Sequence, residues 1–297
     1  MLSSMYSAIS GMQSFQTQLD VIGNNIANVN TVGFKAGRVD FSDVLSQTKS
    51  GGNAATAAQG GTNPQQVGLG TQVGDIQTLF TQGAPQATGS PTDLTINGGG
   101  LFVVSPDGNT MYYTRAGDFT LDSNNNLVLP DGSIAMGYSV SDSPSPAAPA
   151  SPINLDNLVS AYNTANPAAT VTLDANPDVQ IGSDGSVTAT VTDNTTNASE
   201  RMTLGHLALA SFPNPAGLEK VGDSLFSPSA NSGGVTYQTP GSGSAGSLQS
   251  GYLEMSNVDL TQEFTNMIVA QNAFTANSKM IGTDNTILND IVNMKNS

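Results

Sequence analysis

Few residues of this chain could carry out catalysis or hold a metal ion. The sequence contains one histidine, His206, and no cysteine. His206 lies within the apolar run of residues 204–210, which we interpret as a strand that carries the imidazole as a packed or solvated ring. Without cysteine or a second histidine, the chain lacks the usual zinc ligands, a thiol nucleophile and any disulfide. We therefore predict no catalytic residue, no cofactor and no metal site.

Two motifs match ligand-binding loops only in part. Residues 122–126 begin like a calcium-binding loop, with Asp122 in the position of the first ligand. Leu127 stands where such a loop has glycine and Ser133 where it has a bidentate glutamate, so we predict a hairpin turn here. The triple glycine of residues 98–100 is followed by Leu101 and not by Lys-Ser or Lys-Thr, which argues against a phosphate-binding loop.

The charge balance excludes several classes of partner. The 297 residues include 23 acidic and 8 basic ones, for a formal net charge of −15. Nucleic acids and anionic membranes both require a basic surface, and the few cations are scattered. No run approaches the ~18 apolar residues of a membrane span, and residues 1–6 lack the features of a cleaved signal peptide. We expect no nucleic-acid partner and no membrane insertion, and composition alone favours a soluble cytoplasmic protein.

The N-terminal segment has the apolar spacing of one long helix. Large apolar side chains recur there at steps of three or four residues, which places them on one helix face. They are Leu2, Met5, Ile9, Met12, Phe15, Leu19, Ile22, Ile26 and Val29. At about 1.5 Å per residue, such a helix spans roughly 40 Å.

The C-terminal segment has a matching apolar pattern. Its main stripe recurs at every seventh residue, at Leu260, Met267, Phe274, Ile281 and Leu288, and Phe264 is one of several residues that widen it. We expect the N-cap of this helix at residues 256–257, with acidic side chains at 259 and 263 near its positive end.

Neither terminal helix is expected to be stable alone. Gly11, Gly23 and Gly282 each weaken a helix by about 1 kcal/mol relative to alanine. Stability must then come from a partner, and the simplest partner is the other terminus. The residues leave two possibilities open: an ordinary helical pair within one chain, or an assembly interface that is disordered in the free monomer.

The middle of the chain reads as an antiparallel β domain. Asp-Gly pairs at positions 107–108, 131–132 and 184–185 are each flanked by runs rich in β-forming residues. Such pairs favour tight hairpin turns because glycine readily adopts positive φ. Residues 50–70, 141–152 and 229–247 are of low complexity and predict flexible or loosely folded connectors. The fold class is therefore mainly β with helical termini.

Several long motifs resemble those of the flagellar rod and hook proteins. The first is the segment of residues 19–35, whose signature residues are Asn24, Asn25, Ala27, Asn28, Thr31, Gly33, Phe34 and Lys35. Residues 251–260, 267–271 and 277–279 are similar to the C-terminal signature of the family, and residues 93–102 and 113–119 to its central β domain. The resemblance covers nearly the whole chain except about residues 141–176.

The resemblance implies a layered tube. Residues 1–30 and 257–297 would form a coiled coil inside a helical polymer, with residues 31–70 as a connector. Residues 71–256, with an insert around 141–176, would form the outer β domain. The fifteen apolar residues of the two stripes would then be the polymerisation surface.

The resemblance also implies a role, partners and a location. We expect the hook, the flexible joint that passes torque from rod to filament, because residues 21–26 and 263–274 are more similar to hook than to rod sequences. The chain resembles the compact hooks of some Gram-positive bacteria. The alternative is the distal rod protein of the basal body.

Expected partners are further copies of the chain, the rod, the hook cap and the hook–filament junction proteins. The type III export apparatus would carry the unfolded chain out of the cell without a cleaved signal peptide. Phe41 and Leu45 fit a short export-gate motif, or else are buried where the inner layer begins. An adhesin-like β protein or an enzyme would not need the paired apolar termini.

Overall fold

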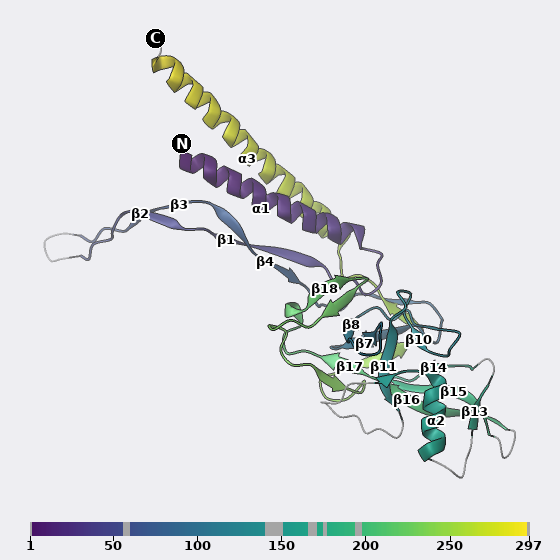
Figure 1. The fold of residues 1–297 in the computed structure, drawn as a ribbon. Coiled ribbons are helices and arrows are strands. Elements are labelled where there is room, and N and C mark those ends of the chain that lie inside the picture. The colour runs from purple at the N-terminus through teal and green to yellow at the C-terminus, as the bar shows by residue number, and fades with distance from the viewer. Residues whose placement is uncertain are drawn as a thin grey trace. The chain divides into compact units, whose positions relative to one another are not determined.

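The computed structural model describes residues 2–55, 60–139, 151–165, 171–174, 177–193 and 198–295. The chain divides into two compact units (Figure 1). The first unit consists of Met1–Asn28, Ala36–Leu79 and Val258–Ser297, and the second of Val29–Lys35 and Phe80–Asn257.

The first unit contains the two terminal helices, α1 (Leu2–Ala27) and α3 (Leu260–Lys295). They lie side by side and run antiparallel (Figure 1). Three pairs of residues face each other across the two helices. On each helix, the second residue is seven positions from the first and the third is fourteen positions from the second. The pairs are Ser4 with Asp284, Gly11 with Asn277, and Asn25 with Glu263. In the described part of the chain, no helix is long and apolar enough to cross a membrane.

Small and polar side chains form the contact between the two helices. On α1, the most buried side chains are Ala8, Ser14, Ile22 and Asn25, and on α3 it is Ala270. A Cβ atom built on Gly11 would lie only 2.8 Å from the amide nitrogen of Asn277, so this glycine permits a close approach. The expected apolar stripes therefore lie beside the contact, and apart from Ile22 the stripe residues with described side chains stay at least partly open in the single chain.

Helix α3 begins later than the sequence suggests. The carboxylate Oδ1 of Asp259 accepts hydrogen bonds from the backbone N–H groups of Thr261 (2.8 Å) and Gln262 (3.2 Å). Asp259 is therefore the N-cap, and the expectation of a cap at residues 256–257 is wrong. Asn257 instead donates through its amide to the hydroxyl of Thr81 at 2.8 Å.

The first unit also contains a long β-hairpin that we call the arm. Its base pairs β1 (Gly37–Asp43) with β4 (Thr71–Thr78), and its outer part pairs β2 (Ser46–Ser50) with β3 (Gln65–Gly68). A register shift between Asp40 and Phe41 marks a bulge in β1. The sequence suggested only a loosely folded connector over much of this region.

The second unit is built around one large antiparallel sheet. The path through it has the order β13, β15, β16, β11, β7, β8, β19, β18. The bounds are β13 Val171–Leu173, β15 Ser186–Asp193, β16 Ser199–Leu207, β11 Ile134–Ser139, β7 Leu101–Ser105, β8 Tyr112–Thr114, β19 Leu225–Ser227 and β18 Glu219–Gly222. Off this path lie β9 Thr120–Leu121, β10 Leu127–Val128, β12 Ser151–Pro152, β14 Gln180–Ile181, β17 Leu209–Ser211 and β20 Thr236–Gln238.

Two smaller strand pairs join the end of the second unit to its beginning. Strand β21 (Ser247–Ser250) pairs with β6 (Leu94–Asn97), and β22 (Tyr252–Glu254) pairs with β5 (Pro85–Ala87). These two strand pairings hold the segment before α3 against the early strands of the second unit. The only 3₁₀ helix among the described residues is Pro215–Gly217.

The predicted hairpin turns are confirmed. Each Asp-Gly pair joins two paired strands, and the glycines at 108, 132 and 185 have φ values of 73°, 87° and 78°. The run of residues 122–126 is the turn between β9 and β10, in which the Asp122 carboxylate accepts a hydrogen bond from the backbone N–H of Asn124 at 3.0 Å.

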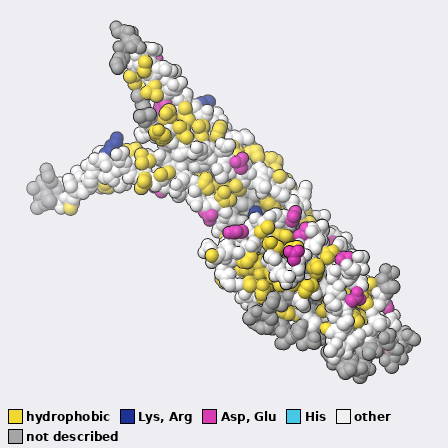
Figure 2. All heavy atoms as spheres, in the orientation of Figure 1, with side chains coloured by type: hydrophobic (Ala, Val, Ile, Leu, Met, Phe, Trp, Pro, Cys, Tyr) yellow, Lys and Arg dark blue, Asp and Glu magenta, His cyan; other side chains and the backbone are white. Residues whose placement is uncertain are grey.

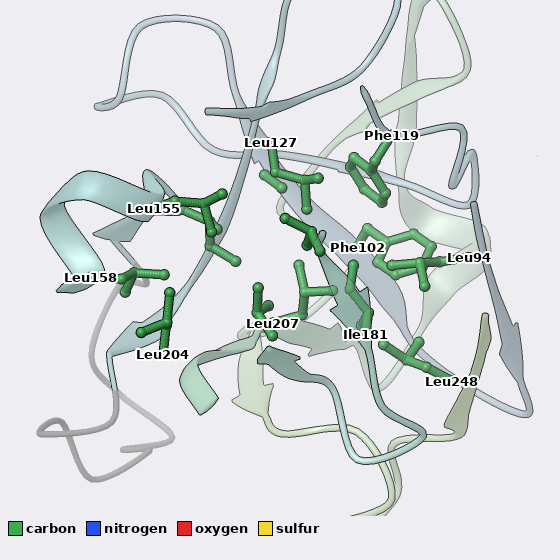
Figure 3. Close-up of a cluster of buried hydrophobic side chains, with 14 of the residues drawn as sticks. Leu94, Phe102, Phe119, Leu127, Leu155, Leu158, Ile181, Leu204, Leu207 and Leu248 are labelled. Atoms are coloured by element: carbon green, nitrogen blue, oxygen red, sulfur yellow. The ribbon is translucent and has the colours of Figure 1, made fainter. Parts of the chain in front are cut away.

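The second unit has two clusters of buried apolar side chains, and the helix α2 (Leu155–Ala165) packs against one part of the larger cluster. Figure 3 shows Leu155 and Leu158 of this helix pointing toward Leu204 and Leu207 on β16. A Cβ atom on Gly205 would lie 3.2 Å from both methyl groups of Leu158, so a glycine on β16 lets the helix pack closely. The structure confirms the predicted fold class: antiparallel β domains with N- and C-terminal helices that contact each other.

Candidate functional site

The segment just after α1 is held in the second unit by a buried ion cluster. Lys35, Arg115 and Glu254 form this cluster, and they are 1%, 4% and 0% exposed. The ammonium of Lys35 lies 2.6 Å from Oε1 of Glu254, and Nη1 of Arg115 lies 3.1 Å from Oε2. Two cations therefore share one carboxylate away from water.

Backbone groups complete the ion cluster. Oε1 of Glu254 also accepts a hydrogen bond from the N–H of Gly83 at 2.9 Å. The ammonium of Lys35 donates to the carbonyl of Thr81, and Nη2 of Arg115 donates to the carbonyl of Gly98, both at 2.8 Å. Burial lowers the pKa of Lys35 and of Arg115, and the Glu254 carboxylate opposes both shifts.

Two further contacts position the same segment. The N–H of Gly33 donates to the backbone carbonyl of Glu254 at 2.8 Å. The ammonium of Lys220 on β18 lies 4.8 Å from the ring centroid of Phe34 and donates to the carbonyl of Lys35 at 2.9 Å. Burial also lowers the pKa of Lys220. The signature residues Gly33, Phe34 and Lys35 thus have their contacts within the second unit.

In the first unit, Asn25 joins three elements at one point. Its amide Nδ2 donates to the carbonyl of Gly37 at the start of β1 (2.8 Å) and to Oε1 of Glu263 on α3 (3.1 Å). Its Oδ1 accepts from the N–H of Gly37 at 2.9 Å. Because Asn25 is 1% exposed, no water can replace these bonds, and the residue sets the register between α1, the arm and α3.

Replacement of Asn25 by alanine should destabilise the first unit by about 2–3 kcal/mol, because it leaves both backbone groups of Gly37 without their partner. Amide hydrogen exchange at Gly37 and chemical unfolding measure this effect. The matched control is Asn24→Ala, since Asn24 is exposed. Equal unfolding curves for the two variants would contradict the role given to Asn25.

The remaining signature residues lie at various depths. Ala27 is exposed, whereas Asn28, Thr31 and Phe34 are half-buried. Asn28 donates through its amide to the carbonyl of Asn24 at 2.9 Å, where α1 ends. Val29, expected at the end of the helix stripe, follows α1 and is half-buried.

The apolar helix residues are only partly covered in the single chain. On α1, Ile22 is buried and the others with described side chains are half-buried; these are Met5, Ile9, Met12, Phe15, Leu19 and Ile26. On α3, Met267, Ile281 and Leu288 are half-buried, while Leu260, Phe264 and Phe274 are 38%, 50% and 36% exposed. The yellow side chains along the helical part of Figure 2 are consistent with this open apolar surface.

Phe41 and Leu45 lie at and just beyond the end of the arm's base. Phe41 is 41% exposed on β1, with its ring centroid 5.6 Å from that of Phe15, and Leu45 is 66% exposed. Both side chains are exposed in the single chain. The structure therefore gives no support to the alternative explanation, in which these residues are buried where the inner layer begins.

The residues considered for chemistry do not converge. His206 lies on β16, opposite Tyr138 and Ser186 in the sheet. Within the described ranges, no group of three or more His, Asp or Glu residues could hold a metal ion. The sequence did not predict the ion cluster, because Arg115 is 80 positions from Lys35 and 139 positions from Glu254. The one signal for it was that charged residues are rare in this chain and that these three stand in apolar surroundings.

The second unit also has an open cavity of about 370 Å³, whose lining of polar and apolar residues includes Asp118, Asp131 and Asp223. Burial raises the pKa of Asp118, and the nearby Asp93 and Asp131 carboxylates add to this rise. In the folded chain, the Asp118 carboxyl therefore stays protonated at pH values at which it has lost its proton in the unfolded chain.

We expect stability to fall as the pH rises from the usual Asp range through the higher pKa of folded Asp118. Asp118→Asn should remove this dependence and raise Tm at neutral pH. Thermal unfolding of both proteins between pH 4 and 7 tests this, with the exposed Asp43→Asn as control. A lower Tm for Asp118→Asn at neutral pH would contradict it.

The fold defines a structural subunit: a β domain held by a buried ion cluster, and paired terminal helices with open apolar faces. Residues 5–35 match the family described as Flagella basal body rod protein, and residues 95–189 match Flagellar hook protein FlgE/F/G D1 domain. Residues 249–294 match Flagellar basal body rod FlgEFG protein C-terminal.

The chain is 45% identical over 296 residues to the flagellar basal-body rod protein FlgG of Bacillus subtilis, covering 99% of this chain and 100% of that protein. It is 36% identical over 297 residues to FlgG of Borreliella burgdorferi, covering 99% of both. It is 30% identical to the hook protein FlgE of the same organism, over 443 aligned positions covering both chains completely. The chain therefore belongs to the flagellar rod and hook protein family, whose members are axial structural subunits and not enzymes.

Proposed function

We propose that the chain is the distal rod subunit of the flagellar basal body. The observation that carries this proposal is the end-to-end match to rod proteins of the same length, at 45% identity in one case and 36% in another. The sequence favoured the hook, with the distal rod as alternative; the relatives favour the rod.

Length supports the same choice. The hook relatives of Borreliella burgdorferi and Treponema pallidum align over 443 and 463 positions, which a chain of 297 residues spans only with long gaps. A hook must bend as it rotates, whereas a rod transmits torque as a stiff shaft. A chain that lacks the additional segments of the hook relatives is better suited to the rod.

Polymerisation through the terminal helices is supported by their surface. Ile268 and Ile291, which also widen the predicted stripe of α3, are 59% and 48% exposed, and the neighbouring Val269 is 61% exposed. Contiguous apolar surface of this kind is uncommon on a monomer and marks an association site. Copies of the same chain would cover it and give the inner layer of a tube, with residues 80–257 as the outer β domain; the expected bounds of 71–256 and 31–70 change because Thr71–Thr78 pairs with β1 in the arm.

The proposed partners follow from this role. The chain would contact further copies of itself, neighbouring rod proteins and the hook, and the hook cap and hook–filament junction proteins would assemble beyond it. The export apparatus would deliver the unfolded chain, with Phe41 and Leu45 as the gate motif. Its location would be the basal body, outside the inner membrane.

Electron microscopy of basal bodies from a strain without this gene tests the proposal. A truncated rod is the expected result. A complete rod that ends without a hook would overturn the rod assignment and restore the hook.

The helix surface can be tested in vitro. The double variant Phe264→Ser, Ile268→Ser should leave the unfolding free energy of the monomer within about 0.5 kcal/mol, because both side chains are exposed. It should raise the critical concentration for polymerisation at least about tenfold, measured by sedimentation. Gln271→Ser, an exposed polar change on the same helix, is the control. An unchanged critical concentration would exclude these two side chains from the interface.

A further inference from the structure

The two terminal helices each carry a charged side chain that is exposed in the single chain. Asp20 is the only charged residue of α1, and Lys279 is the only basic residue of α3 whose side chain the structure describes. Among the described residues, neither one forms an ion pair or a hydrogen bond. Glu263 and Asp284, by contrast, bind across the helix pair. Asp20 and Lys279 are therefore open to a partner outside the chain.

Asp20 and Lys279 lie on opposite sides of the helix pair. Asp20 is nine positions from Gly11, and Lys279 is nine positions from Ala270. Gly11 and Ala270 belong to the contact between α1 and α3, and nine residues are about two and a half helical turns. Asp20 therefore points away from α3, and Lys279 points away from α1. A second copy beside the first can place its Lys279 against Asp20 and keep its own Asp20 open for a third copy.

The two charges also lie at different heights along the helix pair. Asn25 faces Glu263 in this antiparallel pair, so Asp20 is level with Ile268. Ile268 and Lys279 are eleven positions apart, which is about 16 Å along the helix axis. A contact that joins Asp20 to Lys279 of the next copy therefore shifts each copy by roughly this distance. A heterologous contact with a repeated shift gives an open helical assembly and not a closed dimer.

A glycine stands three positions after each of these charged residues. Gly23 and Gly282 are poor helix formers, and a Cβ atom on either one would meet no described atom within 4 Å. Gly11 differs from them, because it permits the close approach of Asn277. Packing within the chain thus explains Gly11 but neither of the other two glycines. A helix of a second copy would explain both, because it can come closest where no side chain stands.

We propose that α1 of one copy packs antiparallel against α3 of a second copy, with Asp20 paired to Lys279 of that copy. In this register Gly23 lies opposite Ala276 of the second copy, so the two backbones can approach closely. The charges are complementary, and the small side chains around them are exposed in the single chain. The inference rests on the proposed function and deepens it, because it names the helix faces that join and the shift between copies.

Asp290 offers a competing contact for Lys279. It is also exposed, and it lies eleven positions from Lys279, which is about three turns, so both are on the same face of α3. Two α3 helices could pair Lys279 with Asp290 in both directions, but such an isologous contact closes at a dimer. Since Ser4 faces Asp284, Asp290 also lies beyond the first residue of α1, where α3 continues without it (Figure 1). A polymer therefore favours the contact through Asp20.

Charge reversal tests the pair in the full-length chain. Asp20→Lys and Lys279→Asp should each raise the critical concentration for polymerisation about fivefold or more, measured by sedimentation at low salt. The double variant should return it to within about twofold of the parent value, because the same pair forms again with its charges exchanged. The unfolding midpoint of the monomer should stay unchanged in all three, since both side chains are exposed. Single variants without effect, or a double variant without rescue, would overturn the proposal.

Asp290→Lys is the matched control, because it changes the net charge as Asp20→Lys does. It should leave the critical concentration within about twofold of the parent value and should not rescue Lys279→Asp. Rescue of Lys279→Asp by Asp290→Lys would overturn the proposal in favour of the closed dimer.

Cross-linking tests the contact directly. The chain has no cysteine, so Asp20→Cys and Lys279→Cys, prepared as separate proteins, each carry a single thiol. A short bifunctional thiol reagent, added to a polymer of both proteins, should join them into covalent dimers. A polymer of either protein alone should give none. Dimers from Lys279→Cys alone, or none from the mixture, would overturn the proposal.

Gly282→Leu separates a role in assembly from a role within the monomer. Leucine favours a helix more than glycine does, so the unfolding midpoint of the monomer should rise. The critical concentration should nevertheless rise about tenfold, because the new side chain keeps the second copy away. An unchanged or lower critical concentration would overturn the close approach. A parent chain that does not polymerise would overturn the proposed function together with this pairing, whereas a parent that polymerises without rescue or cross-link overturns the pairing alone.

Discussion

Replacement of Glu254 by glutamine is expected to destabilise the second unit by about 3–5 kcal/mol, because it leaves Lys35 and Arg115 buried without a counter-charge. The amide also cannot accept all three hydrogen bonds that the carboxylate now receives at its two oxygens. Chemical unfolding followed by tyrosine fluorescence should show a much lower midpoint, since this part of the chain contains most of the tyrosines.

The comparison for this prediction is Glu219→Gln, on an exposed edge strand of the same unit, which should change stability by less than about 0.5 kcal/mol. If Glu254→Gln unfolds at the same denaturant concentration as this control, the ion cluster does not stabilise the unit. Replacement of all three charged residues by apolar ones of similar size would be far milder than the single change, because no isolated charge would remain buried.

The second large effect is expected at Gly33. Its φ of 67° lies in the left-handed region, and a Cβ atom there would lie 2.4 Å from the backbone nitrogen of Ala116 and 2.7 Å from the carbonyl carbon of Arg115. Backbone atoms cannot move aside as a flexible side chain can. Gly33→Ala should therefore destabilise the second unit by about 3 kcal/mol or more, through strain and through displacement of the neighbouring Lys35.

Gly234→Ala is the matched control, since Gly234 lies in the same unit, has open space around its Cα and does not have positive φ. Thermal unfolding of the two variants measures the difference. A Tm for Gly33→Ala within 1 °C of that of the control would show that the contact with Ala116 relaxes at no cost.

Features that depend on local sequence could be predicted well. The Asp-Gly turns, the hairpin at Asp122 and both terminal helices follow from spacing and turn chemistry alone. Helix α2 could have been found in the same way, because Leu155, Leu158, Val159 and Tyr162 have helical spacing. Its position next to a Ser-, Pro- and Ala-rich stretch hid this signal.

The outer part of the arm could not be found by periodicity. In β2 and β3 every residue is exposed, so neither strand has the alternation of apolar and polar residues that identifies a half-buried strand. The contact face of α1 was also hidden. A small residue such as Gly11 carries no signal on a hydrophobicity scale, although it allows a close approach to α3.

The ion cluster was out of reach for a different reason. Lys35 belongs to a recognisable signature, but nothing in the sequence says that its partner is Glu254 and not one of the other acidic residues. Pairing between residues far apart in sequence is decided by the folded sheet, and only the strands β22 and β5 bring Glu254 to Gly83 and Lys35.

The ion cluster also imposes an order of events on folding. Lys35 and Glu254 are 219 positions apart, so their contact closes a loop that contains almost the whole second unit. Closing so long a loop is slow compared with forming a local hairpin. A chain that is delivered from its N-terminus holds two cations without a counter-charge until residue 254 arrives. The ion cluster therefore cannot be complete before residue 254 is present, and we expect the second unit to reach its final packing only when its last strand, β22, has been delivered.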